Sequence, residues 1–239
     1  MAFASQSESQ AQPHGALAID VRDLDFRYGA DFRLQIPKLE VFQGERLAFV
    51  GASGCGKTTL LSILSGILPA DSGRVEVLGR ELSVLNEAAR RAFRISQIGL
   101  VFQEFELLEY LTGWENLLLP FRLNRALRLD SSAKSYAADL AKTLGIFDLL
   151  HRRPEHLSQG ERQRLSLGRA LVHKPQCILC DEPTGNLDPD ATSTSLDLLF
   201  ETAQGIEATV VVVTHNHQIL PGFDRVVDVS SWSQRGASL

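Results

Sequence analysis

A glycine-rich stretch, GASGCGKT at residues 51–58, has the residue types and spacing of a loop that binds nucleoside triphosphates. Its glycines let consecutive backbone N–H groups face a β-phosphate without interference from Cβ atoms. Lys57 is placed to reach the β- and γ-phosphates, and the Thr58 hydroxyl to ligate Mg²⁺. The alternative, an unrelated glycine-rich turn, does not explain why a strand-like segment precedes the stretch and a helical one follows it. We predict nucleotide contacts from these residues: Gly51, Ala52, Ser53, Gly54, Cys55, Gly56, Lys57, Thr58 and Thr59.

Two adjacent carboxylates end an apolar run, CILCDEP at 177–183. Asp181 is predicted to hold the Mg²⁺ through a water, and Glu182 to polarise a second water for in-line attack on the γ-phosphate. His215 directly follows another apolar run, TVVVVT at 209–214, and reaches the same predicted edge of the sheet. There it can bond the γ-phosphate and orient Glu182. The alternatives are an incidental surface charge for Glu182 and an ordinary strand-end histidine for His215.

A second candidate anion site is the helix start within HLSQGERQRLSLGRAL, residues 156–171. Unpaired backbone N–H groups and the helix dipole favour an anion there, with Ser158 and Gly160 at the first turn. Ser158 is also a favourable N-cap, and the two roles can coexist. The stretch lies far along the chain from the glycine-rich loop, so one domain would carry two phosphate-binding helix starts.

Cysteine usage predicts no disulfide framework, because three cysteines are unevenly placed. Cys177 and Cys180 form a C-x-x-C, which also occurs in metal and redox sites. They fall within a predicted strand, however, where alternation points the two side chains to opposite faces. His217 is predicted to be solvated.

Composition excludes several classes of protein. A net charge of −5 and a pI near 5.7 argue against general nucleic-acid binding. No stretch approaches the ~20 apolar residues of a membrane helix, and the amino-terminal residues lack the positive start and apolar core of a signal peptide. We therefore expect a cytoplasmic protein without a nucleic-acid partner.

Strands alternating with helices predict an α/β fold built on a mostly parallel sheet. Strands are expected over 19–28, 46–50, 74–79, 98–102, 177–181, 209–214 and 225–229. Helices are expected over 58–68, 86–94 and 190–204. The leucine-rich residues from 104 to about 150 are expected to be helical. We predict a disordered leader over 1–16 and one domain over 17–235. A helical subdomain at about 104–172 is predicted to be inserted between core strands.

Six motifs occur in order: the loop at 51–58, Gln103, LSQGE at 157–161, ILCDE at 178–182, NLD at 186–188, and His215. With them the chain resembles the ATP-binding subunit of an ABC transporter from about residue 17 to 230. LSQGE distinguishes this family from other phosphate-loop proteins, because they lack it. The resemblance implies a P-loop NTPase fold with an antiparallel β subdomain, ATP as substrate and Mg²⁺ as cofactor. It also implies that Gln103 contacts the metal and takes part in catalysis.

Head-to-tail pairing of two copies is a further implication of the resemblance. Ser158, Gln159 and Gly160 would then contact a γ-phosphate held by the partner, and Asp188 would cross the same interface. An isolated copy would hold two half-sites, which accounts for the second helix start. Tyr28 matches the aromatic residue that stacks on adenine in this family; the alternative is a plain strand-end tyrosine.

Two positions depart from the family pattern, since Gln159 replaces the usual glycine and Glu161 a frequent glutamine. A side chain at position 159 is expected to alter the approach of the helix start to the phosphate and to slow turnover. GERQR and DEPTGNLD are usual in the branch that contains the lipoprotein-release, macrolide-export and cell-division ATPases. That branch implies an integral membrane permease as partner and a place at the cytoplasmic face of the inner membrane.

Four functions are candidates on this basis. The first is a transport ATPase for lipoprotein, lipid or drug export, and the second is an ATPase that regulates cell-division or cell-wall machinery. Soluble ABC proteins of translation or DNA repair carry two ATPase units or a long coiled coil, and a small-molecule kinase has no need of LSQGE. The apolar residues after Gln103 are expected to meet the permease, although half of them can instead pack inside: Phe105, Leu107, Leu108 and Leu111.

Overall fold

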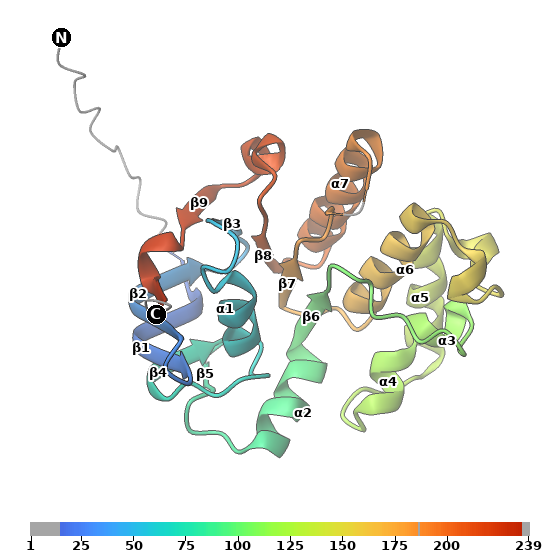
Figure 1. Cartoon of the computed structure of the whole chain (residues 1–239). Helices are drawn as coiled ribbons and strands as arrows, with labels where there is room; N and C mark the ends of the chain where they lie inside the picture. Colours follow the sequence, from blue (N-terminus) through green and yellow to red (C-terminus); the bar gives the residue numbers. More distant parts are fainter. Residues whose placement is uncertain (1–14, 186, 236–239) are drawn as a thin grey trace, which may run out of the picture.

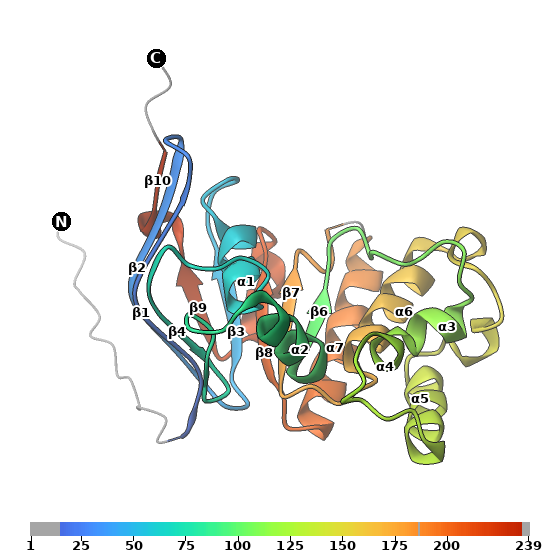
Figure 2. The same cartoon turned by 90° about the horizontal axis from the view of Figure 1, so that it is seen from below.

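The structure, a computed structural model, describes residues 15–185 and 187–235. It contains a five-stranded antiparallel sheet, a five-stranded parallel sheet and flanking helices. The antiparallel sheet lies at one end of the molecule, the parallel sheet in the middle, and a group of helices at the other end (Figures 1 and 2). The predicted α/β fold class is confirmed. Of the predicted leader, residues 1–14 lie outside the described residues.

The antiparallel sheet has the order β10-β2-β1-β4-β5. Its strands are β1 (Leu17–Tyr28), β2 (Phe32–Phe42), β4 (Ser72–Val77), β5 (Arg80–Glu81) and β10 (Ser233–Arg235). Strand β2 was not predicted, because the alternation of its residues changes phase in the middle. Leu34 and Ile36 are buried, then Pro37 and Lys38 are both exposed, and burial resumes at Leu39. Three-residue β10 is too short to show a period.

The parallel sheet has the order β6-β7-β8-β3-β9. Its strands are β3 (Arg46–Val50), β6 (Ile98–Val101), β7 (Cys177–Asp181), β8 (Thr209–Val213) and β9 (Arg225–Asp228). The last residues of β3, β7 and β8 meet at one edge, since carboxyl ends of neighbouring parallel strands coincide. The predicted phosphate loop, the acidic pair and His215 lie at or just after these strand ends.

Cys177 and Cys180 lie on opposite faces of β7, as strand alternation predicts. Cys177 packs in the hydrophobic cluster shared with the antiparallel sheet, and Cys180 in the cluster beneath the helices of the other end. Burial raises the pKa of Cys177 to about 12. Neither thiol is placed for a shared metal site.

The helices beside the sheet are α1 (Lys57–Leu64), α2 (Glu87–Gln97) and α7 (Pro189–Gly205). The expectation that the first helix runs to residue 68 is wrong. Gly66 adopts the left-handed conformation with φ of 69°, and its N–H donates to Ile63 O at 2.9 Å. A glycine in this conformation ends a helix, so Pro69 lies beyond its end.

The helices at the other end are α3 (Gly113–Leu117), α4 (Leu119–Leu123), α5 (Ser131–Thr143) and α6 (Gln159–Leu171). Short 3₁₀ turns occupy Phe147–Leu149, Pro154–His156, His217–Gly222 and Ser230–Trp232. Residues 102–112 contain no helix, which corrects the expectation that the helical region begins at 104. Within the described ranges, no helix has the length and apolar character needed to cross a membrane.

Candidate nucleotide-binding site

The glycine-rich loop connects β3 to α1 and uses backbone conformations that favour glycine. Gly54 has φ of 73° and Gly56 has φ of 93°. A Cβ atom on Gly56 would also lie 2.7 Å from Cζ of Phe32. Gly56 is the N-cap of α1 and has no side chain to cover the first-turn N–H groups. The start of α1 therefore presents free donors and the positive end of the helix dipole to an anion.

Lys57 lies across this loop with only 8% of its surface exposed. Its Nζ donates to Gly51 O at 2.7 Å and to Ala52 O at 3.2 Å. These carbonyl bonds keep the buried ammonium hydrogen-bonded and hold it inside the loop. Phosphate oxygens are stronger acceptors for this cation than neutral carbonyls are.

The carboxylate of Asp181 sits at the end of β7 beside the Thr58 hydroxyl. Burial raises the pKa of Asp181, as does neighbouring Glu182, while a hydrogen bond with Thr58 and the charge of Lys57 act in the opposite direction. Among the described residues, no group donates a hydrogen bond to its buried Oδ1 atom. A hard cation is the ligand that such an orphaned oxygen fits, and the Thr58 hydroxyl supplies a second oxygen.

Glu182 and His215 form a pair at the same sheet edge. His215 Nδ1 lies 2.8 Å from Glu182 Oε2, and the His215 backbone N–H donates to the same oxygen at 3.3 Å. The Glu182 side chain is 14% exposed, whereas that of His215 is 69% exposed. The exposed histidine thus contacts a largely buried carboxylate from the solvent side.

The backbone of Glu182 is also unusual, because its φ is 47°. Its N–H donates to Val213 O at 3.0 Å, which ties this strained turn to the end of β8. Non-glycine residues in this region cost about 1–3 kcal/mol and cluster at functional sites. With this backbone conformation, Glu182 lines the same cavity as Asp181 and the phosphate loop.

A cavity of about 350 Å³ joins these groups. It is lined by Tyr28, Phe32, Ser53, Gly54, Gly56, Lys57, Thr58, Thr59, Gln103, Asp181, Glu182, Val213 and His215. Tyr28 is 49% exposed at the end of β1, with Phe32 6.0 Å away between ring centroids. Sequence analysis missed Phe32, which lies at the start of the unpredicted β2. Cys55, predicted with the loop, is buried beneath it, with 7% of its surface exposed.

None of the residues predicted to act across a dimer lines this cavity. Ser158 is the exposed N-cap of α6: its Oγ accepts from Glu161 N at 3.3 Å, and its own N–H donates to Glu161 Oε2 at 2.7 Å. The bond from the Ser158 backbone lowers the pKa of Glu161. Asp188 similarly caps α7 and is exposed. Gln159 is exposed, Gly160 is partly buried, and Asn186 of the NLD motif lies outside the described residues.

The segment after Gln103 is held by α6. Phe105 and Glu106 both have positive φ, at 62° and 51°. The buried Arg169 donates to the carbonyl oxygens of both residues, and Ser166 Oγ donates to Phe105 O at 3.1 Å. Burial lowers the pKa of Arg169 to about 10. Helix α6 therefore carries Ser158 at its start and, near its end, hydrogen-bonds the segment that follows Gln103.

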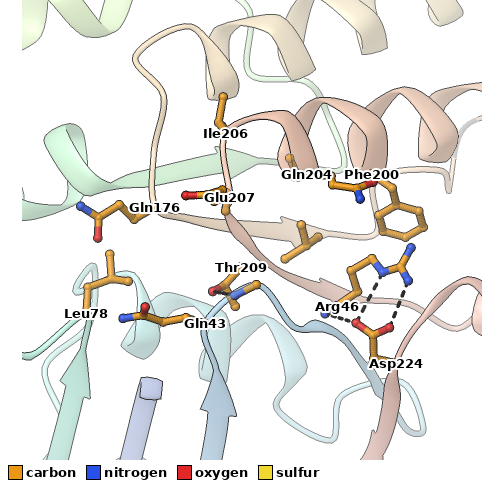
Figure 3. A pocket seen from close by; sticks show the side chains of 14 residues that line it. Gln43, Arg46, Leu78, Gln176, Phe200, Gln204, Ile206, Glu207, Thr209 and Asp224 are labelled. Carbon is orange, nitrogen blue, oxygen red and sulfur yellow. Dashed lines mark hydrogen bonds and ion pairs between the residues drawn. The ribbon is translucent and has the colours of Figure 1, made fainter. Parts of the chain in front are cut away.

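A larger cavity, about 1040 Å³, lies at the opposite edge of the parallel sheet (Figure 3). Its only arginine, Arg46, lies 3.0 Å from Asp224 and 5.4 Å from the centre of the Phe200 ring. Because this cation is already neutralised by Asp224, the cavity offers no comparable phosphate site.

Comparisons with known proteins agree with this geometry. The profile of the ABC transporter family matches residues 34–185. The chain is 40% identical over 191 residues to the lipoprotein-releasing system ATP-binding protein LolD of Xanthomonas campestris pv. campestris strain 8004, covering 80% of this chain and 79% of that protein. It is 37% identical over 214 residues to LolD of Hydrogenovibrio crunogenus, covering 87% and 92%.

Solved structures with the same fold include dimeric MJ0796, a bacterial ABC transporter cassette, with a TM-score of 0.77 and 25% identity. That match covers 92% of this chain and 100% of the other. CbiO1 from Clostridium perfringens, part of an ABC transporter complex, matches with a TM-score of 0.77 and 26% identity, covering 89% and 84%.

A glycine-rich loop after one parallel strand, with an acidic pair after a nearby strand, defines a P-loop nucleotide-binding protein. The family profile and the curated relatives carry the assignment further. The chain belongs to the ABC transporter family, and it is an ATP-binding, ATP-hydrolysing subunit of that family. The resemblance predicted from six motifs is confirmed.

Proposed function

We propose that two copies of this chain pair head to tail around two ATP molecules and drive a membrane permease in lipoprotein release. The observation that carries the proposal is the split of the predicted site. Glu182 and His215 line the phosphate cavity, whereas Ser158 and Asp188 lie outside it on exposed helix starts. The similarity to LolD proteins supports lipoprotein release over the other exports of the same branch.

In the proposed reaction, Glu182 is the general base. Its carboxylate accepts a proton from the attacking water as the water oxygen bonds to the γ-phosphorus and the bond to the β-γ bridging oxygen breaks. The products are ADP and inorganic phosphate. His215 holds the carboxylate through Nδ1 and is exposed enough to approach a γ-phosphate oxygen.

Magnesium is the proposed cofactor. The Thr58 hydroxyl and the orphaned Oδ1 of Asp181 would hold it, with Gln103 at the edge of the same cavity. When bound, Mg²⁺ neutralises charge on the β- and γ-phosphates. The chain's own contribution is to place Lys57 and the α1 donors around the same phosphates.

The second copy would complete each site. Ser158 would donate its hydroxyl to the γ-phosphate held by the partner, while its backbone keeps the capping bond to Glu161. Gln159 and Gly160 would frame that phosphate, and Asp188 would cross the interface. The exposed Gln159 side chain is proposed to keep the helix start further from the phosphate and slow turnover.

A groove of about 230 Å³ next to the Gln103 segment is the proposed docking site of the permease. It has a mainly apolar lining that includes Phe102, Leu119, Pro120 and Leu123. The four residues predicted for this contact, Phe105, Leu107, Leu108 and Leu111, do not line the groove, and Leu107 packs against the core. Docking there would place the chain at the cytoplasmic face of the inner membrane.

Copurification tests this function. The tagged chain, solubilised with a mild detergent from membranes of its host, is expected to bring down an integral membrane protein with few spanning helices and a large extracytoplasmic region. The Leu123→Glu variant is expected to lose that protein while still binding ATP. Recovery of a cell-division protein as the sole membrane partner would replace lipoprotein release by the division function.

A further inference from the structure

Two arginine-bearing segments lie side by side on one face of the molecule. Helix α2 packs against α4, and Asn124 Nδ2 donates to Ala92 O at 3.0 Å. Figure 2 looks onto this face and shows α2 in front with α4 beside it. These two segments carry four exposed arginines, Arg91, Arg122, Arg125 and Arg128, and we call the surface of the two segments the arginine face.

The charge of this region opposes that of the whole chain. Residues 86–97 contain three arginines and one glutamate, and residues 119–130 contain three arginines and one aspartate. The two segments together carry +4, since six positive charges face two negative ones, whereas the chain carries −5. Positive charge is therefore concentrated here against the general trend.

Not all of these arginines are available to a ligand. Arg90 donates to Leu85 O at 2.8 Å and Arg94 to Gly66 O at 3.0 Å, so both support the fold. Burial lowers the pKa of Arg94, and the Arg91 and Arg90 guanidiniums lower it further. Arg122 is within 3.7 Å of Glu115, a loose exposed pair.

Arg91 and Arg125, in contrast, are available to a ligand. Over the described ranges, neither makes an ion pair or a side-chain hydrogen bond, and both line a concavity of about 650 Å³. Asn86 and Asn124 line the same concavity, and Glu87 is its one acidic residue. The two guanidiniums form a donor set suited to phosphate oxygens, whereas the amides of Asn86 and Asn124 already bond the backbone.

The concavity continues into the groove proposed for the permease. Ile95 and Leu123 line both, and Leu123 is 53% exposed. If that groove receives a membrane protein, then the adjoining arginine face is turned toward the lipid surface around it. This step rests on the proposed function.

We propose that the arginine face binds the phosphate groups of anionic lipids, with Arg91 and Arg125 as the principal contacts and Leu123 at the apolar margin. Each exposed arginine near an anionic surface strengthens binding by about fivefold. Lipid contact would keep the subunit oriented against the membrane through the opening and closing of the dimer.

Sedimentation with vesicles tests this proposal on the full chain. Vesicles of phosphatidylethanolamine with phosphatidylglycerol are expected to bind the chain, whereas phosphatidylcholine vesicles are not. Binding should weaken with salt, because exposed charges are screened. The Arg91→Glu/Arg125→Glu variant is expected to lose at least about 25-fold in affinity, from two contacts.

A matched control is Lys38→Glu/Arg80→Glu, which makes the same charge change on exposed residues of the antiparallel sheet. It is expected to bind vesicles within about threefold of the parent, because charges beyond a Debye length are screened. An Arg91→Gln/Arg125→Gln variant removes the cations without reversal and covers the case in which the glutamate variant fails to fold.

The proposal would be overturned by equal binding to both vesicle types, by equal losses in the two charge-reversed variants, or by inorganic phosphate binding that is lost in Arg91→Gln/Arg125→Gln while the parent does not bind vesicles. Loss of permease copurification in the Arg91→Glu/Arg125→Glu variant with unchanged vesicle binding would assign the face to the permease instead. ATP binding and permease recovery, measured separately, show whether the proposed function itself has failed.

Discussion

At the scale of single residues, Glu182 carries the most specific chemical prediction. Glu182→Gln keeps the size of the side chain and one acceptor oxygen but removes its ability to accept a proton. Hydrolysis is expected to fall by about 10²–10⁴-fold, while ATP affinity stays within about threefold of the parent. Single-turnover hydrolysis and equilibrium ATP titration measure the two effects.

The Glu182 variant is also expected to accumulate an ATP-bound dimer, visible by size-exclusion chromatography. His215→Ala serves as the comparison, since it removes the Nδ1 contact and leaves the carboxylate in place. A Glu182→Gln protein that hydrolyses ATP near the parent rate would show that another group is the base.

The prediction for Lys57 is different, because its ammonium is expected to act in ATP binding as well as in hydrolysis. In Lys57→Ala the loop loses the buried cation that now bonds Gly51 O and Ala52 O. ATP affinity is expected to fall by about 10–100-fold, consistent with the loss of one charge-assisted bond to phosphate. Titration with a fluorescent ATP analogue measures it, and unchanged affinity would contradict the assignment of the loop.

At the scale of elements, α6 joins two parts of the proposed machinery. It begins at the Ser158 cap and, near its other end, Arg169 bonds the carbonyls of Phe105 and Glu106. Both bonded residues have positive φ and are therefore strained. A shift of α6 would thus be transmitted to the segment that follows Gln103.

Replacing Arg169 is expected to release this segment. Arg169→Lys keeps the charge but loses the planar pair of donors, so it is expected to lower the free energy of unfolding by about 1–2 kcal/mol. Hydrogen exchange over residues 104–110 is expected to speed up, while exchange at the loop 51–58 stays unchanged. Ser166→Ala, which removes one bond to the same carbonyl, is the milder control. Exchange that remains equally slow in Arg169→Lys would show that Arg169 does not hold the segment.

Some of these elements could be predicted from the sequence and others could not. Strands β7 and β8 are continuous apolar runs bounded by polar residues, so their ends and the site residues that follow them were predictable. Strand β2 was not, because Pro37 and Lys38 interrupt its alternation. Phe32 was missed with it, although the ring bounds the phosphate loop.

Long-range contacts explain the other misses. Leucines at helical spacing favoured a helix after residue 104, but the carbonyls of Phe105 and Glu106 are bonded by Arg169, more than sixty positions away in the chain. No local pattern reports such a bond. The same holds for the bond between Glu182 and His215, although both residues were predicted from the strands that precede them.

At the scale of the whole molecule, the two phosphate-binding helix starts belong to different regions. Helix α1 starts in the cavity beside the parallel sheet, and α6 starts among the helices at the other end (Figure 1). Neither Ser158 nor Asp188 lines that cavity. Shared catalysis between two copies gives both exposed helix starts a role.

Mixing two inactive variants tests this arrangement. Lys57→Ala disables the phosphate loop, and Ser158→Arg places a bulky side chain at the start of α6. Each homodimer is expected to be inactive, because every composite site then carries one lesion. In a mixed dimer, one site carries both lesions and the other carries neither. Hydrolysis is therefore expected to recover to about half of the parent rate per mixed dimer, as a two-fold arrangement of shared sites requires.

The control for this experiment is Ser158→Ala, which removes the hydroxyl and the cap without adding bulk. As a cap alone, Ser158 would contribute about 1 kcal/mol to stability, and its loss would leave hydrolysis intact at temperatures where the protein is folded. A hydroxyl that also donates to the partner's γ-phosphate makes Ser158→Ala slower under those same conditions. Normal hydrolysis by the Ser158→Arg homodimer would reject shared catalysis, since a side chain of that size cannot fit between two closed subunits, and Ser158 would then be a cap only.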